Sequence, residues 1–203
     1  AASGADEVVV LADRQTGGRG RLDRSWASPS GGIWLSILIR PDVPPAAAPL
    51  FTLAAAVATA EAAREAGIDA GIKWPNDVLL VEGPTDSSDD PPVDGGKLAG
   101  VLTEMEGEAD RIAWLVVGIG VNANVPAGDL PDGVGATSLR AELGHEVDRR
   151  RFTQRLLERF QSLREKPASI VPSWRELTVT LGRDVGVETP SGTVEGRALD
   201  VTD

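Results

Sequence analysis

The sequence predicts an α+β fold, with a mixed, largely antiparallel central sheet and helices on one side of it. Three observations indicate this arrangement. Short apolar runs typical of strands recur along the chain, and one pair of them, over 68–82, is joined by a tight turn. An alanine-rich segment over about 46–66 and an amphipathic segment over 148–164 have the length and periodicity of helices. With 203 residues, 41% of them hydrophobic, the chain can bury one substantial core and carry a small appended domain.

The first two expected strands flank a long loop. VVVLA predicts a strand over 7–12, and IWLSILIR predicts another over 33–40, whose unbroken hydrophobicity is typical of a strand buried on both faces. The hairpin over 68–82 follows from Pro75, which restricts Trp74 to extended backbone, and from the Asn-Asp pair after it, which favours a turn. The same strand end presents lysine, asparagine and aspartate, so a ligand site there is the competing interpretation.

A second pair of strands follows an acidic, proline-rich insertion over 82–96, to which we assign no function. KLAGVLTEME, which begins at Lys97, and the run over 111–124 predict two strands that pair with each other. Gly118 and Gly120 inside the second run predict the close approach of a ligand or of another backbone, with a simple bulge as an equal alternative.

The helices complete the expected architecture. Small residues over about 46–66 predict close packing against the sheet, with Gly67 as the stop. Arginines on the amphipathic helix over 148–164 are interpreted as a solvated face, and a short helix is expected around 167–178. The remaining residues predict two short strands around a Pro-Ser-Gly turn. The start without methionine and the abrupt end predict a chain cut from a longer protein at both ends.

The composition excludes several kinds of chemistry. The absence of cysteine removes disulfides, thiolate nucleophiles and zinc-thiolate sites. The single histidine, His145, lies in a polar segment and is interpreted as solvated. The excess of 31 Asp+Glu over 20 Lys+Arg, a net charge of −11, argues against nucleic-acid binding and suggests adaptation to high salt. No signal peptide is recognisable and the segment 46–63 is weakly hydrophobic, so we expect a soluble, cytoplasmic protein with no membrane contact.

The loop from Asp13 to Trp34 is the strongest candidate for a functional site. It contains four arginines and five glycines between the first two strands. Glycine lets backbone amides approach a ligand closely, and guanidinium groups bind carboxylate or phosphate oxygens in pairs. In an acidic chain such a concentration of positive charge predicts an anion-binding loop, although a solvated linker would have a similar composition.

Five motifs in fixed order give the chain a family resemblance. They are GRGRLDRSW (18–26), KWPNDVLL (73–80), KLAGVLTE (97–104), GIGVNAN (118–124) and the weaker ATSL (136–139). With them the chain resembles the biotin protein ligases from about residue 7 to its end. The resemblance implies a catalytic domain of the class II synthetase and biotin–lipoate ligase type over 1–178, followed over 179–203 by the start of a small SH3-like β-barrel. The Ser-Thr-Asn segment that family members carry before the first strand is not found.

The resemblance implies a reaction in two steps. The biotin carboxylate attacks the α-phosphate of ATP, which gives biotinyl-5′-adenylate and pyrophosphate, and a lysine of a biotin carboxyl carrier domain then attacks the adenylate. ATP and biotin are therefore the expected substrates. Mg²⁺ is expected with the pyrophosphate leaving group, but the sequence names no ligand for it.

The resemblance also implies roles for residues of the motifs. The implied catalytic residues are Arg19, Arg21, Lys97 and Asp77, with Asp77 placed to orient the incoming amine or to accept its proton. The implied biotin-binding residues are Gln15, Gly18, Arg19, Gly20, Arg21 and Lys97. The implied nucleotide-binding residues are Arg24, Trp26, Lys73, Asn76 and Asn122.

Other functions compete with this interpretation. Lipoate ligases and octanoyl transferases share the implied fold, but they are not expected to show this series of motifs. A non-catalytic module that binds biotin or biotinyl-adenylate, or the core of a repressor, is the main alternative. Against it stands the retention of Arg21, Asp77 and Lys97, because simple biotin binding needs no phosphate site. The sequence leaves a homodimer open and indicates no nucleic-acid partner.

Overall fold

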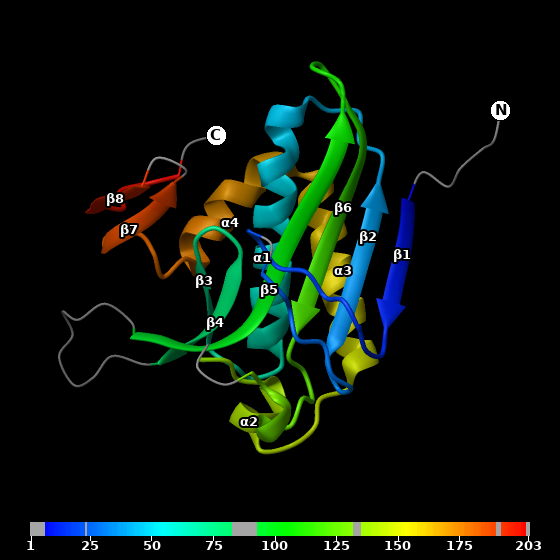
Figure 1. Cartoon of the computed structure of the whole chain (residues 1–203), viewed down its shortest axis with the longest axis vertical. Helices are drawn as coiled ribbons and strands as arrows, with labels where there is room; N and C mark the ends of the chain where they lie inside the picture. The colour runs from blue at the N-terminus through cyan, green and yellow to red at the C-terminus, as the bar shows by residue number, and fades with distance from the viewer. Residues whose placement is uncertain (1–6, 23, 83–92, 132–134, 190–191, 202–203) are drawn as a thin grey trace.

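Six strands form one sheet in the order β1-β2-β6-β5-β4-β3 (Figure 1). The structure is a computed structural model of the chain, and it describes residues 7–22, 24–82, 93–131, 135–189 and 192–201. The strands are β1 (Glu7–Ala12), β2 (Ile33–Ile39), β3 (Ala70–Lys73), β4 (Asp77–Glu82), β5 (Val93–Gly107) and β6 (Ile112–Val121). Each neighbouring pair in this sheet is antiparallel, which confirms the predicted α+β fold with its largely antiparallel sheet. The acidic insertion falls mostly on 83–92, outside the described residues.

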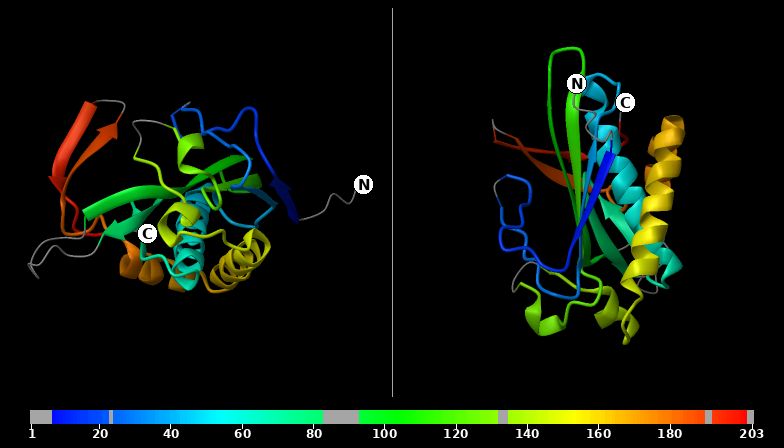
Figure 2. Two further views of the ribbon diagram at one scale, coloured as in Figure 1. Left: turned by 90° about the horizontal axis from the view of Figure 1, so that it is seen from below. Right: turned by 90° about the vertical axis from the view of Figure 1, so that its right-hand side faces the viewer.

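Three helices cover one face of the sheet, while the loop over 13–32 lies on the opposite face (Figure 2, right). The helices are α1 (Ala48–Glu65), α3 (Arg149–Glu165) and α4 (Ile170–Leu177). The short 3₁₀ turns are η1 (Pro45–Ala47), η2 (Ala127–Asp129) and η3 (Pro167–Ser169). A five-residue helix, α2 (Leu139–Leu143), lies at one end of the sheet and was not expected from the sequence. The helices on one face leave the other face to the basic loop.

Helix α1 is the centre of the core. Its small side chains lie against the sheet and against α3 and α4, and residues 54–58 are fully buried. Among the described residues, the helical stretch Pro45–Glu65 alone is long and apolar enough to cross a bilayer, with a mean hydropathy of 1.5, so the expectation that 46–63 is too weakly hydrophobic was wrong. The fold accounts for this composition, because 61% of an apolar 18-residue window within that stretch is buried inside the protein.

A separate hairpin ends the chain. Strands β7 (Asp184–Thr189) and β8 (Gly192–Arg197) pair with each other as the sequence predicts. The connection from α4 runs beside the edge of β3, where the Val179 amide donates to the Ile72 carbonyl at 2.9 Å. The edge strand β3 is therefore covered by the segment that leads to the hairpin. The SH3-like barrel and the domain boundary at 178 stay predictions.

Candidate active site

A large cavity lies on the face of the sheet that the helices leave uncovered. Its volume is about 1100 Å³, and it is enclosed by the basic loop, the turn between β3 and β4, and the ends of β5 and β6. Eleven of the twelve site residues predicted from the sequence line it: Gln15, Arg19, Gly20, Arg21, Arg24, Trp26, Lys73, Asn76, Asp77, Lys97 and Asn122. Motifs that are distant in sequence therefore meet at one place.

The basic loop is folded back on itself. The Gln15 amide donates to the Ser28 carbonyl at 3.0 Å, the Trp26 amide to the Gly18 carbonyl at 2.9 Å, and the Gly20 amide to the Arg24 carbonyl at 2.7 Å. Gly18 is the one predicted site residue that does not line the cavity, and the pairing of residues 18 and 26 requires a glycine there. A Cβ on Gly18 would lie 2.3 Å from the Trp26 carbonyl oxygen, so the loop could not close with any other residue there.

The indole of Trp26 rests on a floor made by two glycines. Gly100 of β5 and Gly120 of β6 are direct cross-strand partners. A Cβ on Gly120 would lie 2.6 Å from the indole Nε1, and a Cβ on Gly100 would lie 3.0 Å from the ring. Gly120 therefore serves a close approach, but the approaching group is an aromatic side chain of the loop, where the sequence predicted a ligand or another backbone. The Trp26 Nε1 is buried and finds no acceptor among the residues that the structure describes.

A β-bulge turns Lys97 toward the cavity. Val78 pairs with Ala99 while Leu79 pairs with Lys97, so Leu98 is an extra residue in β5. Leu98 is buried in the core, and the Lys97 ammonium lies 5.1 Å from the centre of the Trp26 ring. It also forms an ion pair with Asp77, with 2.7 Å between Nζ and Oδ1, and both side chains are about a quarter exposed (27% and 28%).

The two loop arginines nearest the sheet also contact oxygens of the protein. Arg19 Nη2 lies 2.7 Å from Glu104 Oε2, and Arg21 Nη1 donates to Asn76 Oδ1 at 3.2 Å. Glu104 is a cavity residue that the sequence analysis did not identify. The signal was present, because Glu104 ends the KLAGVLTE motif and a strand places it on the same face as Gly100. The pairing of Arg19 with it depends on the loop's position and could not be predicted.

Two buried asparagines hold the walls of the cavity together. Asn76 Nδ2 donates to the Val101 carbonyl at 2.7 Å, across the gap between the β3–β4 turn and β5. Asn122 Nδ2 donates to the carbonyls of Lys97 at 3.3 Å and Thr137 at 3.0 Å. Both amides are therefore engaged in fixing the backbone, although both residues line the cavity.

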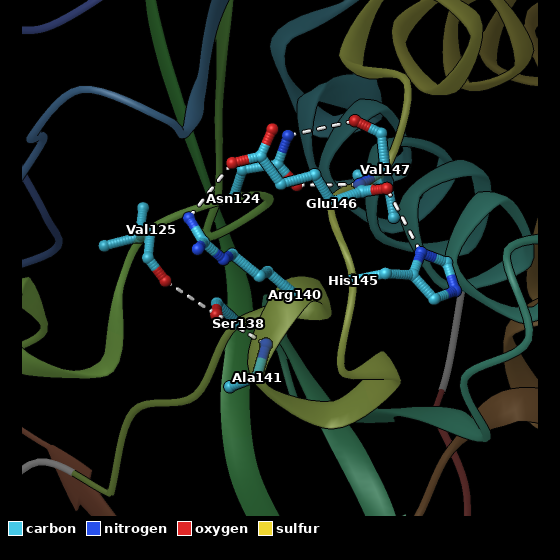
Figure 3. A network of polar contacts seen from close by, with 8 residues as sticks. All are labelled: Asn124, Val125, Ser138, Arg140, Ala141, His145, Glu146 and Val147. Carbon is cyan, nitrogen blue, oxygen red and sulfur yellow. Dashed lines mark hydrogen bonds and ion pairs between the residues drawn. The ribbon is translucent and has the colours of Figure 1, made fainter.

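The weaker ATSL motif supports the Lys97 backbone. The Thr137 amide donates to the Lys97 carbonyl at 3.0 Å, and the Lys97 amide donates to the Gly135 carbonyl at 2.7 Å. This segment is in turn anchored by α2, because Ser138 Oγ accepts from the Ala141 amide and donates to the Val125 carbonyl (Figure 3).

The same network joins the segment after α2 to the end of β6. The Asn124 side chain both donates to the Val147 carbonyl and accepts from its amide (Figure 3). Arg140 pairs with Glu146 at 3.0 Å. His145, expected to be solvated, is exposed and makes its contact with the Glu146 carbonyl. The network therefore has a structural function and stabilises the support of Lys97.

The described part of the chain has no metal site formed by protein side chains alone. Within it, no group of three or more His, Asp or Glu side chains is arranged to hold a cation. The two acids of the cavity, Asp77 and Glu104, are each paired with a basic residue. Any metal in this cavity would therefore have to draw most of its ligands from a bound substrate.

The fold and the cavity together define a class of protein, an α+β domain with a cavity between a basic, glycine-rich loop and an antiparallel sheet. Residues 3–122 match the model of the biotin/lipoate A/B protein ligase family, and the chain belongs to this family.

Relatives and solved structures agree with this assignment. The chain is 37% identical over 205 residues to the bifunctional ligase/repressor BirA of Bacillus subtilis, which covers 97% of this chain. It spans only 59% of the length of that relative. It is 36% identical over 218 residues to the biotin–[acetyl-CoA-carboxylase] ligase of Mycobacterium tuberculosis, covering 100% of this chain and 74% of that protein. The biotin protein ligase from Aquifex aeolicus in complex with biotin and ATP superposes with a TM-score of 0.74 at 28% identity, covering 96% of this chain and 78% of that one.

Proposed function

We propose that this chain joins biotin to ATP as biotinyl-5′-adenylate, releases pyrophosphate, and transfers the biotin to a lysine of a biotin carboxyl carrier domain. The observation that carries the proposal is the convergence of Arg19, Arg21 and Lys97 on one cavity of about 1100 Å³. Relatives with 36% and 34% identity are named as biotin–[acetyl-CoA-carboxylase] ligases, and the Aquifex structure contains biotin and ATP.

The first step needs fixed positive charge. A carboxylate that approaches a polyphosphate is repelled, and the phosphorus centre gains further negative charge on its equatorial oxygens in the transition state. Arg19, Arg21 and Lys97 would supply the opposing charge. Each would exchange its present protein partner for an oxygen of the substrate.

The second step needs a proton acceptor or an orienting group for the attacking amine. Asp77 is the carboxylate placed to do this, but in the structure it is paired with Lys97 at 2.7 Å. When Lys97 turns to the phosphate or to the biotin carboxylate, Asp77 loses its partner and becomes available to the amine. Asp77 thus becomes available only after the first substrates are bound.

The remaining expectations belong to the same proposal. Mg²⁺ would neutralise the departing pyrophosphate, held mainly by phosphate oxygens, which agrees with the lack of an acidic cage among the described residues. Gln15 would contact the biotin ureido group, and Arg24, Lys73, Asn76 and Asn122 would surround the nucleotide. We further propose that residues 179–203, which contain the β7–β8 hairpin, begin an SH3-like barrel after the catalytic domain over 1–178. A cytoplasmic location and a homodimer stay expectations from the sequence.

Exchange of labelled pyrophosphate into ATP tests the first step. We expect exchange that depends on biotin, measured at low and at molar KCl, and a loss of at least about 100-fold in Lys97→Ala or Arg21→Ala, because each removes charge that stabilises the transition state. Lys166→Ala is the matched control, since Lys166 is an exposed lysine at the end of α3. Exchange that survives Lys97→Ala would contradict the proposed role of the cavity.

The same protein sample can test the alternative of a non-catalytic binding module. Calorimetric binding of biotin without any exchange, in a chain shown to be folded, would indicate a sensor or repressor core. The mass added to the carrier lysine distinguishes biotin from lipoate.

A further inference from the structure

One aromatic side chain at the cavity is exposed. Trp74 precedes Pro75 in the turn between β3 and β4, lines the cavity, and has 44% of its surface exposed, while the other aromatic side chains of the described chain are buried or half-buried. An exposed indole costs solvation free energy in an isolated protein and is over-represented at the centres of protein interfaces. It is not among the residues to which the proposed chemistry gives a role.

The backbone that carries this indole is held firmly. The Trp74 amide donates to Thr180 Oγ1 at 2.8 Å, and the Ile72 carbonyl accepts from the Val179 amide and from Thr178 Oγ1 at 3.1 Å. The backbone that carries the exposed ring, at the end of β3, is therefore fixed by hydrogen bonds to residues 178–180. Such preorganisation lowers the entropy lost when a partner binds to it.

A second exposed apolar residue stands on the neighbouring wall of the cavity. Leu22, at the tip of the basic loop, has 75% of its surface exposed and also lines the cavity. The loop tip touches the β3–β4 turn through the hydrogen bond from Arg21 to Asn76. Leu22 is next to Arg21 in sequence, and Trp74 is two residues before Asn76. Both apolar side chains therefore lie beside this hydrogen bond, at the opening of the cavity, which we call the mouth.

The mouth is also basic in a protein that is strongly acidic. Arg14, Arg24 and Lys73 line the cavity and are exposed, and the two acids of the cavity are paired with Arg19 and Lys97. The whole chain carries a net charge of −11. An acidic partner is therefore repelled by most of the surface and attracted to this mouth.

We propose that Trp74 and Leu22 form the anchor on which the acceptor protein docks. The partner is an acidic carrier domain with apolar side chains beside its lysine, so that these side chains contact Trp74 and Leu22 while the amine enters the cavity. This inference rests on the proposed function, because the transfer step requires a protein lysine to reach the adenylate from outside the cavity.

Binding and turnover of a carrier domain test the anchor. The probe is the unbiotinylated carrier domain of an acetyl-CoA carboxylase, titrated as the ¹⁵N-labelled protein in NMR and used as substrate in steady-state assays. We expect Trp74→Ala to lower kcat/KM for the carrier by about 10- to 30-fold and to weaken its binding equally, because a buried interface tryptophan contributes that much. Leu22→Glu should act in the same direction, since it adds an acid to a loop tip that faces an acidic partner.

The controls separate docking from chemistry. Trp74→Ala should leave unchanged both the KM for ATP in pyrophosphate exchange and the rate at which hydroxylamine, a small nucleophile, traps the adenylate. Trp114→Ala is the matched control, because Trp114 is a half-buried tryptophan bound to Glu106 at 3.0 Å and lies outside the cavity lining. We expect it to bind the carrier as the parent does.

Three outcomes would overturn the anchor. The first is unchanged carrier binding in both Trp74→Ala and Leu22→Glu. The second is a raised KM for ATP in Trp74→Ala, which would assign the indole to the nucleotide. The third is no binding of the carrier by the parent chain. Failure of the proposed function is a different result, the absence of exchange in the parent, and the NMR titration reports on docking in that case too.

Discussion

At the scale of single residues, the basic loop packs on the sheet because two side chains are missing. Gly100 and Gly120 face each other across two strands, and the Trp26 indole lies in the space that two Cβ atoms would fill. The indole nitrogen is buried without an acceptor among the described residues, which costs about 1–3 kcal/mol. A ligand that displaces or bonds the indole recovers part of this cost, so we expect Trp26 to respond when the cavity fills.

Gly120→Ala tests this packing. A methyl group 2.6 Å from the indole nitrogen forces the ring off the floor. In protein labelled with 5-fluorotryptophan, we expect the ¹⁹F resonance that Trp26→Phe removes to shift strongly in Gly120→Ala. Gly118→Ala is the control, because its Cβ would meet the Leu102 carbonyl oxygen at 3.4 Å, an ordinary contact, and the Trp26 resonance should stay in place. Equal shifts in both variants would show that the glycine floor does not position the ring.

At the scale of secondary-structure elements, α3 depends on its first turn. Three arginines open the helix, where the positive end of the helix dipole disfavours them. Asp148 offsets this as the N-cap, since its carboxylate accepts from the Arg151 amide at 3.1 Å. That hydrogen bond and the nearby arginines hold the pKa of the Asp148 carboxyl below its usual value.

The cap should give α3 a dependence on pH. Because the pKa is lowered in the folded state, the stabilisation is present above the unfolded pKa of about 3.9 and is lost as the pH falls through the folded value. We expect Asp148→Ala to lower the Tm by a few degrees at pH 7, and the difference from the parent to shrink below pH 4. Asp148→Asn keeps a capping oxygen, so its Tm at pH 7 should lie between those of the parent and of Asp148→Ala. A Tm difference that is constant from pH 7 to pH 3 would contradict this account.

At the scale of the whole molecule, the charge is divided unevenly. The chain has a net charge of −11, yet the charged residues that line its cavity are mainly basic. Salt therefore has two opposite effects. It screens repulsion among surface acids, which stabilises the fold, and it screens the attraction between the mouth and an acidic partner, which slows encounter.

Molar KCl should separate these two effects. We expect the Tm to rise between low and molar KCl, measured by differential scanning fluorimetry. Over the same range, kcat/KM for the carrier domain should fall. A Tm that falls with salt would indicate that surface ion pairs, such as Arg175–Asp200 at 2.7 Å, outweigh the repulsion.

The sequence predicted those parts of the molecule whose cause is local. The strands over 7–12 and 33–40 and the helix over 148–164 follow from hydrophobic periodicity, and the structure has them within one or two residues. Helix α2 was missed because five residues carry too little periodicity, and its anchors are the carbonyls of Asn122, Ala123 and Val125, elsewhere in the chain.

The site shows the same limit. The motifs identified the residues that line the cavity, because each motif is a short local run. Their partners were not predictable: Lys97 reaches Asp77 through a bulge at Leu98, and Arg19 reaches Glu104 across 85 positions of sequence. Such pairs depend on strand register and on the path of the loop, which no local pattern specifies.

The pairing of Arg19, Arg21 and Lys97 with oxygens of the protein itself has a consequence for selectivity. An inorganic phosphate or chloride ion that enters the cavity must compete with these protein oxygens for the same cations. A larger ligand that offers several oxygens can replace all three partners together. We therefore expect the site to favour a polyanionic ligand over small anions.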